Sequence, residues 1–114
     1  MPLLRSPPLA VVLSTCPSGD AERIARSIID SRAAACVNVI QGVASVYRWL
    51  GAIETGDEAL LVIKCPHAKL DELAELIETI HPYEVPEIVA FDVAAVHDAY
   101  GSWVDGECQP EKPR

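Results

Sequence analysis

The sequence lacks several features that would place it in common functional classes. Its four cysteines form no Cys-x-x-Cys pair, which excludes zinc-ribbon and thioredoxin-like motifs. Basic residues are few, nine against 17 acidic ones, and a chain of net charge −8 repels phosphate backbones, so we expect no nucleic-acid partner. No apolar run reaches transmembrane length and no signal-peptide pattern opens the chain. We therefore expect a cytosolic protein with reduced cysteines and no membrane partner.

Hydrophobic residues, by contrast, are plentiful. They make up half of the 114 residues, which is enough to build the core of one domain. Residues 1–8 contain three prolines and little periodicity, and we expect a disordered leader there. Residues 9–105 are the expected folded domain, and the polar residues 106–114 the expected flexible tail.

Hydrophobic periodicity predicts the elements of that domain. Ala21, Ile24 and Ile28 recur at helical spacing, and Leu70, Leu73 and Ile77 do the same, which predicts two amphipathic helices. Short apolar or β-branched runs predict strands at 9–15, 37–40, 43–50, 58–65 and 88–93. Gly42, Gly51 and residues 55–57 predict breaks or turns, and residues 94–105 a short helix.

The order of these elements predicts the fold class. Strand, helix, strand, strand, helix, strand is the split βαβ arrangement, an α+β ferredoxin-like sandwich with an antiparallel sheet and both helices on one face. Residues 36–65 read as a long bent hairpin. The strands are apolar on both sides, so the uncovered face needs a cover, and another copy of the chain is the simplest one. We expect a homo-oligomer.

The stretch His81-Pro82-Tyr83-Glu84-Val85-Pro86-Glu87 is a stiff connector between a helix and a strand. Neutral imidazole suits copper and zinc, so His81 is a candidate ligand for a divalent cation, with Glu84 and Glu87 completing the site. The competing interpretation is structural: His81 caps the helix, and the carboxylates pair with Lys64.

Several motifs in sequence order resemble one family. They are Thr15-x-Pro17, Ala34-Ala35-Cys36-Val37-Asn38, Ser45-x-Tyr47-x-Trp49-x-Gly51, Glu58 with Lys64, the connector 81–87 and Tyr100-x-x-Trp103. Together they resemble the CutA family of divalent-cation tolerance proteins. The resemblance implies a tight homotrimer like that of the PII signalling proteins. Some bacterial members carry further proposed copper ligands at two positions that hold Ser14 and Ile80 here.

The resemblance also implies a cleft between neighbouring subunits. The residues we assign to this ligand pocket are Cys36, Asn38, Trp49, Lys64 and Tyr83. Aromatic residues commonly anchor subunit interfaces, and we assign that role to Tyr47, Tyr100 and Trp103. For Cys36, an inert core thiol is the competing interpretation.

Two functions follow from the sequence as hypotheses. The first is a homotrimer for divalent-cation tolerance, binding Cu²⁺ or another divalent cation near the subunit interface, with no tightly bound cofactor. The second is a PII-like sensor or scaffold whose inter-subunit cleft binds a small molecule anchored by Lys64. The chain has no nucleophile elbow, phosphate loop or metal-hydrolase signature, so we expect no enzyme.

Overall fold

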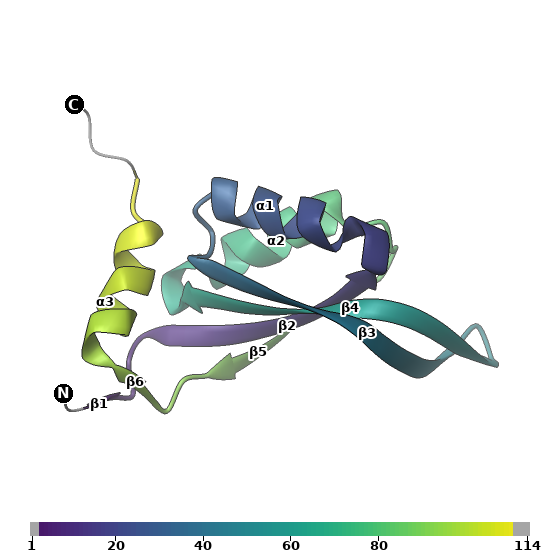
Figure 1. Cartoon of the computed structure of the whole chain (residues 1–114), viewed down its shortest axis with the longest axis horizontal. Coiled ribbons are helices and arrows are strands. Elements are labelled where there is room, and N and C mark those ends of the chain that lie inside the picture. Colours follow the sequence, from purple (N-terminus) through teal and green to yellow (C-terminus); the bar gives the residue numbers. More distant parts are fainter. Residues whose placement is uncertain (1–2, 111–114) are drawn as a thin grey trace.

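Two helices cover one face of a four-stranded antiparallel sheet in the computed structural model, which describes residues 3–110 (Figure 1). The sheet has the order β3-β4-β2-β5. The strands are β2 (Leu9–Pro17), β3 (Cys36–Trp49), β4 (Ala52–Pro66) and β5 (Val89–Asp92), and the helices are α1 (Ala21–Asp30) and α2 (Leu70–Ile80). Short 3-10 turns at Ser18–Asp20 and His67–Lys69 lead into the helices. This order confirms the predicted ferredoxin-like α+β fold.

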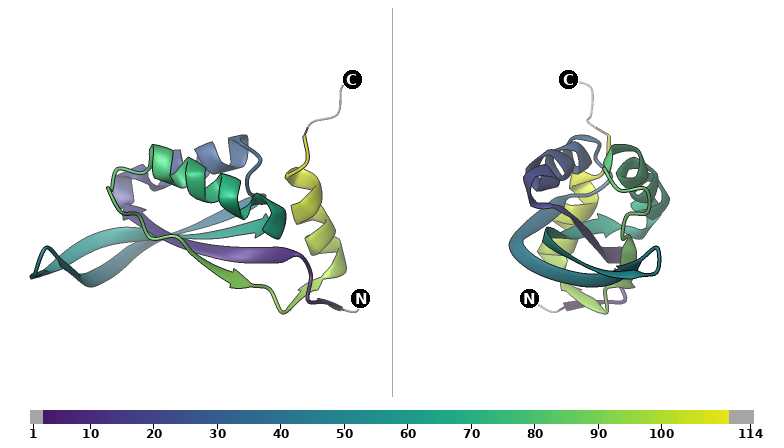
Figure 2. Two further views of the ribbon diagram at one scale, coloured as in Figure 1. Left: turned by 180° about the vertical axis from the view of Figure 1, so that it is seen from behind. Right: turned by 90° about the vertical axis from the view of Figure 1, so that its right-hand side faces the viewer.

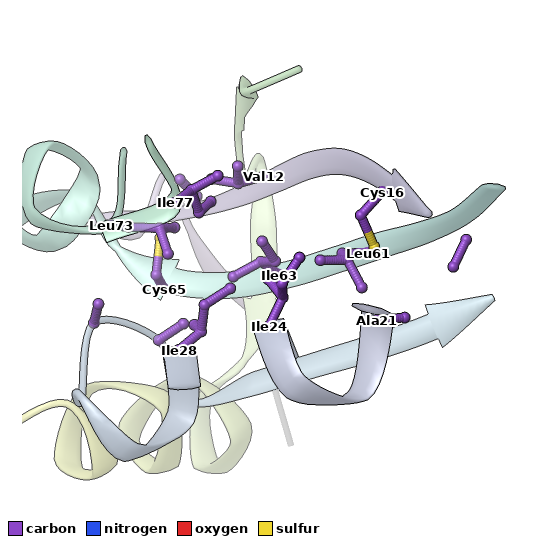
Figure 3. Close-up of a cluster of buried hydrophobic side chains, with 14 residues drawn as sticks. Val12, Cys16, Ala21, Ile24, Ile28, Leu61, Ile63, Cys65, Leu73 and Ile77 are labelled. Carbon is purple, nitrogen blue, oxygen red and sulfur yellow. The ribbon is translucent and has the colours of Figure 1, made fainter. Parts of the chain in front are cut away.

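The core fills the space between the helices and the sheet (Figure 3). Alternate residues of β2 and β4 point to the helices, which contribute the residues that their periodicity predicted. The largest fully buried core side chains are Ile24, Ile28, Leu61, Ile63, Leu73 and Ile77. Their burial fixes the register of both central strands, because a slip by one residue would move the whole set to the other face.

The opposite face of the sheet is apolar but is covered by neither α1 nor α2 (Figure 2). Residues paired across strands share a face, and Val11 pairs with both Lys64 and Phe91, while Leu13 pairs with both Val62 and Val89. The Phe91 side chain is 53 % exposed. We call this face of β2–β5 the open face.

The β3–β4 hairpin extends well beyond the body of the domain (Figure 1). The predicted break at Gly51 is confirmed, because the chain reverses at Leu50 and Gly51. The turn predicted at residues 55–57 is wrong, because β4 begins at Ala52 and runs through them. Gly56 lies inside β4, paired with Ser45. A bulge between Ile40 and Val43 contains Gly42 at φ +76°, a conformation that favours glycine.

Two short strands and a third helix complete the structure. Residues 3–5, expected to belong to a disordered leader, form β1 (Leu3–Arg5), which pairs with β6 (Ala95–His97). The short helix expected within 94–105 is α3 (Asp98–Glu107), so it extends into the expected tail. Residues 6–8 are also held to the domain, since the Ser6 amide donates to the Ala94 carbonyl and the Pro8 carbonyl accepts from the His67 amide, and Cys108 of the expected tail is buried. Residues 1–2 and 111–114 of the predicted leader and tail lie outside the described residues. No helix within residues 3–110 is both long and apolar enough to cross a membrane.

Candidate functional site

The connector after α2 is positioned by its two prolines and by His81. His81 is the C-cap of α2, with extended backbone (φ −78°, ψ 139°), as expected for a residue before proline. Its amide N–H still donates to the carbonyl of Ile77, at 2.9 Å. The chain therefore leaves the helix abruptly and crosses to the end of β2, where the residues of the connector meet β4 and the hairpin.

Both ring nitrogens of His81 are already hydrogen bonded. Nδ1 lies 3.0 Å from the backbone N–H of Tyr83, and Nε2 lies 2.8 Å from the carbonyl oxygen of Thr15. Because Nδ1 faces a donor and Nε2 an acceptor, the arrangement fits the neutral ring with its proton on Nε2. His81 is only 7 % exposed. The imidazole thus ties the connector to β2, and a metal ion could bind it only by replacing one of these partners.

Tyr83 joins the connector to β4. Its hydroxyl donates to Oε2 of Glu58 at 2.8 Å, and its ring lies against that of His81 with centroids 4.8 Å apart. Burial, reinforced by the Glu58 hydrogen bond and negative charge, raises the pKa of Tyr83 to about 12. The phenol therefore stays protonated and keeps donating at physiological pH.

These residues border a cleft of about 730 Å³ between the connector and the outer half of the hairpin. Its lining includes three aromatic rings, from Tyr47, Trp49 and Tyr83, and three carboxylates, from Glu58, Glu84 and Glu87. The side chain of Glu58 is almost fully withdrawn from solvent, since the residue is 5 % exposed, whereas Glu84 and Glu87 lie at the exposed rim. We call this hollow the connector cleft.

The three predicted metal ligands are thus near one another, but they do not converge. Glu84 and Glu87 line the cleft, whereas the nitrogens of His81 point to backbone groups. Within residues 3–110, no group of three His, Cys, Asp or Glu side chains is arranged to hold a metal ion. In one chain, therefore, a cation at this site would have to complete its coordination with other ligands.

The predicted ligand pocket is divided in two within one chain. Trp49 and Tyr83 line the connector cleft, but Lys64, Cys36 and Asn38 lie on the open face, where Cys36 pairs with Lys64. The Lys64 ammonium group donates to Oδ1 of Asn38 and lies 4.0 Å from the Cys36 thiol. Lys64 lies six positions after Glu58 in β4, which is roughly 20 Å of extended strand.

The predicted interface aromatics occupy two places. Tyr47 lines the connector cleft on the hairpin, whereas Tyr100 and Trp103 lie on α3 with ring centroids 5.7 Å apart. Tyr100 is also next to the open-face group: burial, together with the nearby Cys36 thiol, raises its pKa. Each of the three rings is between 39 % and 46 % exposed, so each has surface left for a further contact.

Sequence reasoning missed two contributors to the site. Glu58 was noted only as part of a family motif, and Thr15 acts through its carbonyl, which no side-chain pattern can reveal. A signal for Glu58 did exist. It occupies the same alternation as Leu60, Val62 and Lys64, so it is a carboxylate on the sheet face opposite the helices, where a charge requires a partner.

Comparison with known proteins gives one consistent result. The family model described as CutA1 divalent ion tolerance protein matches residues 10–107. The divalent-cation tolerance protein CutA of Thermus thermophilus is 41 % identical over 95 residues, covering 82 % of this chain and 92 % of the relative. The crystal structure of CutA from Xylella fastidiosa superposes with a TM-score of 0.87 at 35 % identity, covering 90 % of this chain and 99 % of the other. A structure described as PII-like protein CutA from Nostoc sp. gives a TM-score of 0.82 at 33 % identity, covering 88 % and 97 %.

Proposed function

We propose that this chain, which belongs to the CutA1 divalent ion tolerance family, acts as a homotrimer in the cellular response to divalent cations, copper among them. The observation that carries the proposal is the open face, an apolar sheet surface opposite the helices and continuous with a projecting hairpin. The relative from Thermus thermophilus is named for divalent-cation tolerance, which supports the same role here.

The need for a partner copy follows from what is exposed. On the hairpin, Val46, Leu50 and Ile53 are 71 %, 90 % and 69 % exposed, far more than isolated apolar side chains require. The outer edges of β3 and β5 offer further unpaired backbone to a neighbouring strand. Another copy of the same chain carries both an apolar face and a free strand edge, so it can cover the open face and pair with the exposed edges.

Sedimentation equilibrium tests the assembly. We expect a mass three times that of the 12.3 kDa chain at micromolar concentration. Phe91→Asp should dissociate the assembly because it places a charge on the open face, while Glu75→Gln on the exposed side of α2 should leave it intact. A wild-type protein that sediments as a stable monomer would refute the trimer.

For the cation itself, we propose Glu84 and Glu87 as ligands, completed by groups of a neighbouring subunit. Their exposure at the rim of the connector cleft supports this, whereas His81 would have to give up a hydrogen bond to join them. Calorimetric titration with Cu²⁺ and Zn²⁺ tests it. The Glu84→Gln/Glu87→Gln variant should bind at least about tenfold more weakly than wild type, and Glu72→Gln/Glu75→Gln on α2 should bind normally. Equal binding by both variants would leave only diffuse attraction to an acidic surface.

A second candidate function rests on Lys64. Its ammonium group lies on an apolar face beside Asn38, a neutral amide, and the ion pairs found within residues 3–110 do not include it. In a PII-like sensor this group would anchor an anionic ligand in a cleft between subunits. A thermal-shift screen of nucleotides and organic acids should then stabilise wild type but not Lys64→Gln. No shift with any of them would count against the sensor.

We further propose that the protein works in the cytosol and catalyses no reaction. Its four cysteines are all free thiols, as a reducing compartment maintains them. The relative from Thermus thermophilus and the matching family are named for divalent ion tolerance, which supports a role other than catalysis.

A further inference from the structure

The connector cleft has a chemical character that the divalent-cation role does not explain. Its three carboxylates are accompanied by three aromatic rings, and no lysine, arginine or histidine is among the described residues that line it. A cleft lined in this way is negative in charge and contains aromatic rings, whose faces are rich in electrons, and this combination attracts organic cations. At about 730 Å³ it has room for a polyatomic ligand.

Glu58 provides the second, independent observation. It is 5 % exposed, and within residues 3–110 its carboxylate accepts one hydrogen bond, from the neutral phenol of Tyr83. The ion pairs of the described residues do not include it. A carboxylate so far removed from water costs free energy unless a positive charge or several donors compensate it. A bound cation would supply that charge.

The architecture of the cleft distinguishes among cations. A bare divalent ion needs several ligand atoms converging at about 2.0–2.6 Å. The described residues contain no such cluster, so the cleft of a single chain is poorly suited to one. An alkylated ammonium group instead needs a carboxylate at a few ångströms and aromatic faces around its methyl groups. Glu58, hydrogen bonded to Tyr83, lines the same cleft as Tyr47 and Trp49 and offers these components.

We propose that the connector cleft is a binding site for a small organic cation with an alkylated ammonium group, held electrostatically by Glu58 and by the faces of Tyr47, Trp49 and Tyr83. The ligand class is distinct from a metal ion. The proposal does not depend on metal binding.

Choline is a suitable probe, and its uncharged carbon isostere, 3,3-dimethylbutan-1-ol, is the matched control. Both are titrated by calorimetry into the full-length protein in buffer with a chelator, so that metal binding cannot contribute. We expect saturable binding of choline and at least about tenfold weaker binding of the alcohol, because only choline carries the charge. Equal affinity for the two, or no saturable binding of choline, would overturn the proposal.

The Glu58→Gln variant locates the site. Glutamine keeps an oxygen for the Tyr83 hydroxyl but removes the charge, so choline affinity should fall about tenfold while binding of the alcohol stays unchanged. Glu75→Gln on α2, away from the cleft, should bind choline like wild type. If Glu58→Gln fails to fold, Trp49→Leu on the exposed hairpin replaces it and should weaken choline binding in the same way. Choline binding that neither substitution weakens would place the cation elsewhere and refute this site.

Titrating Cu²⁺ in the absence of chelator keeps this proposal separate from the proposed function. Choline binding without Cu²⁺ binding would support the organic-cation site and count against the metal ligands. The reverse result would refute the organic-cation site and leave the metal proposal standing.

Discussion

The hydroxyl of Tyr83 and the carboxylate of Glu58 lie 2.8 Å apart, and this single hydrogen bond joins the connector to β4. Glu58 is only 5 % exposed, and Tyr83 is the only hydrogen-bond donor to its carboxylate among the described residues. The same connector is tied to β2 through His81 and Thr15. One short segment thus links the end of α2 to both central strands.

Tyr83→Phe removes the donor and leaves Glu58 buried without it. We expect the free energy of unfolding to fall by about 1–3 kcal/mol, the usual cost of an unsatisfied buried polar group. Urea denaturation at pH 7 measures it. Tyr47→Phe, on the same cleft but 46 % exposed, should change stability by less than about 0.5 kcal/mol. Equal effects of the two substitutions would show that the hydrogen bond to Glu58 contributes little.

Ser14 presents the opposite case. Its side chain is fully buried and its hydroxyl has no hydrogen-bond partner within residues 3–110. Ser14→Ala should therefore raise the free energy of unfolding, by up to about 1 kcal/mol. Ser31→Ala is the control, because the Ser31 hydroxyl donates to Ile28 at 2.7 Å and accepts from the Ala33 amide at 3.1 Å. That variant should lose about 1 kcal/mol. If Ser14→Ala is the more destabilised of the two, the buried hydroxyl has a partner after all.

The glycines of α3 form a matched pair. A Cβ on Gly101 would approach Cγ1 of Val96 at 2.9 Å, whereas one on Gly106 would meet nothing within 4 Å. Gly106→Ala should stabilise the protein by up to about 1 kcal/mol through helix propensity. Gly101→Ala should instead cost about 1–3 kcal/mol, because α3 must move away from β6. Thermal melts of both variants compare them directly; a stabilised Gly101→Ala protein would mean that α3 packs loosely.

The Cys65 thiol and the Tyr83 phenol predict that the protein loses stability at high pH. Burial, with the nearby Cys108, raises the pKa of Cys65 to about 11 from 9.0, and that of Tyr83 rises to about 12 from 10.0. At a pH between the ordinary and the raised pKa of each group, the folded state keeps a proton that the unfolded state has released. The free energy of unfolding therefore falls as pH rises through this range. Urea midpoints at pH 8 and pH 10.5 measure the decline. Cys65→Ala should make it shallower, and an unchanged slope would exclude Cys65 as a contributor.

The sequence predicted the elements whose side chains follow a single period. Ile24 and Ile28 on α1, and Leu73 and Ile77 on α2, are buried as their spacing required. The hairpin turn was misplaced, because Thr55, Gly56 and Asp57 have turn-forming residue types, yet cross-strand pairing with β3 outweighs that local preference.

Local motifs also identified most of the site residues, but they did not show that these residues fall into two separate groups. The connector predicted His81, Tyr83, Glu84 and Glu87 together because they are neighbours in the chain. The separation of Lys64 from this group could not be predicted, since it depends on how far β4 extends past Glu58. Nor could the pairing of Tyr83 with Glu58, which are 25 residues apart.

The bulge at Gly42 shapes the outer hairpin, whose side chains on the face of Glu58 are set by their pairing with β4. Ile40 pairs with Leu60 and Val43 with Glu58, so β3 has one residue more than β4 between these two pairs. Before the bulge the even-numbered residues of β3 share a face with Glu58, and after it the odd-numbered residues do. Tyr47 and Trp49 thereby share a side with Glu58. Deletion of one residue at the bulge would restore a regular ladder and leave Tyr47 paired with Glu54 and Trp49 with Ala52, so both rings would stay on the side of Glu58. The extra residue therefore bends and twists the arm without changing which side chains it presents beside Glu58.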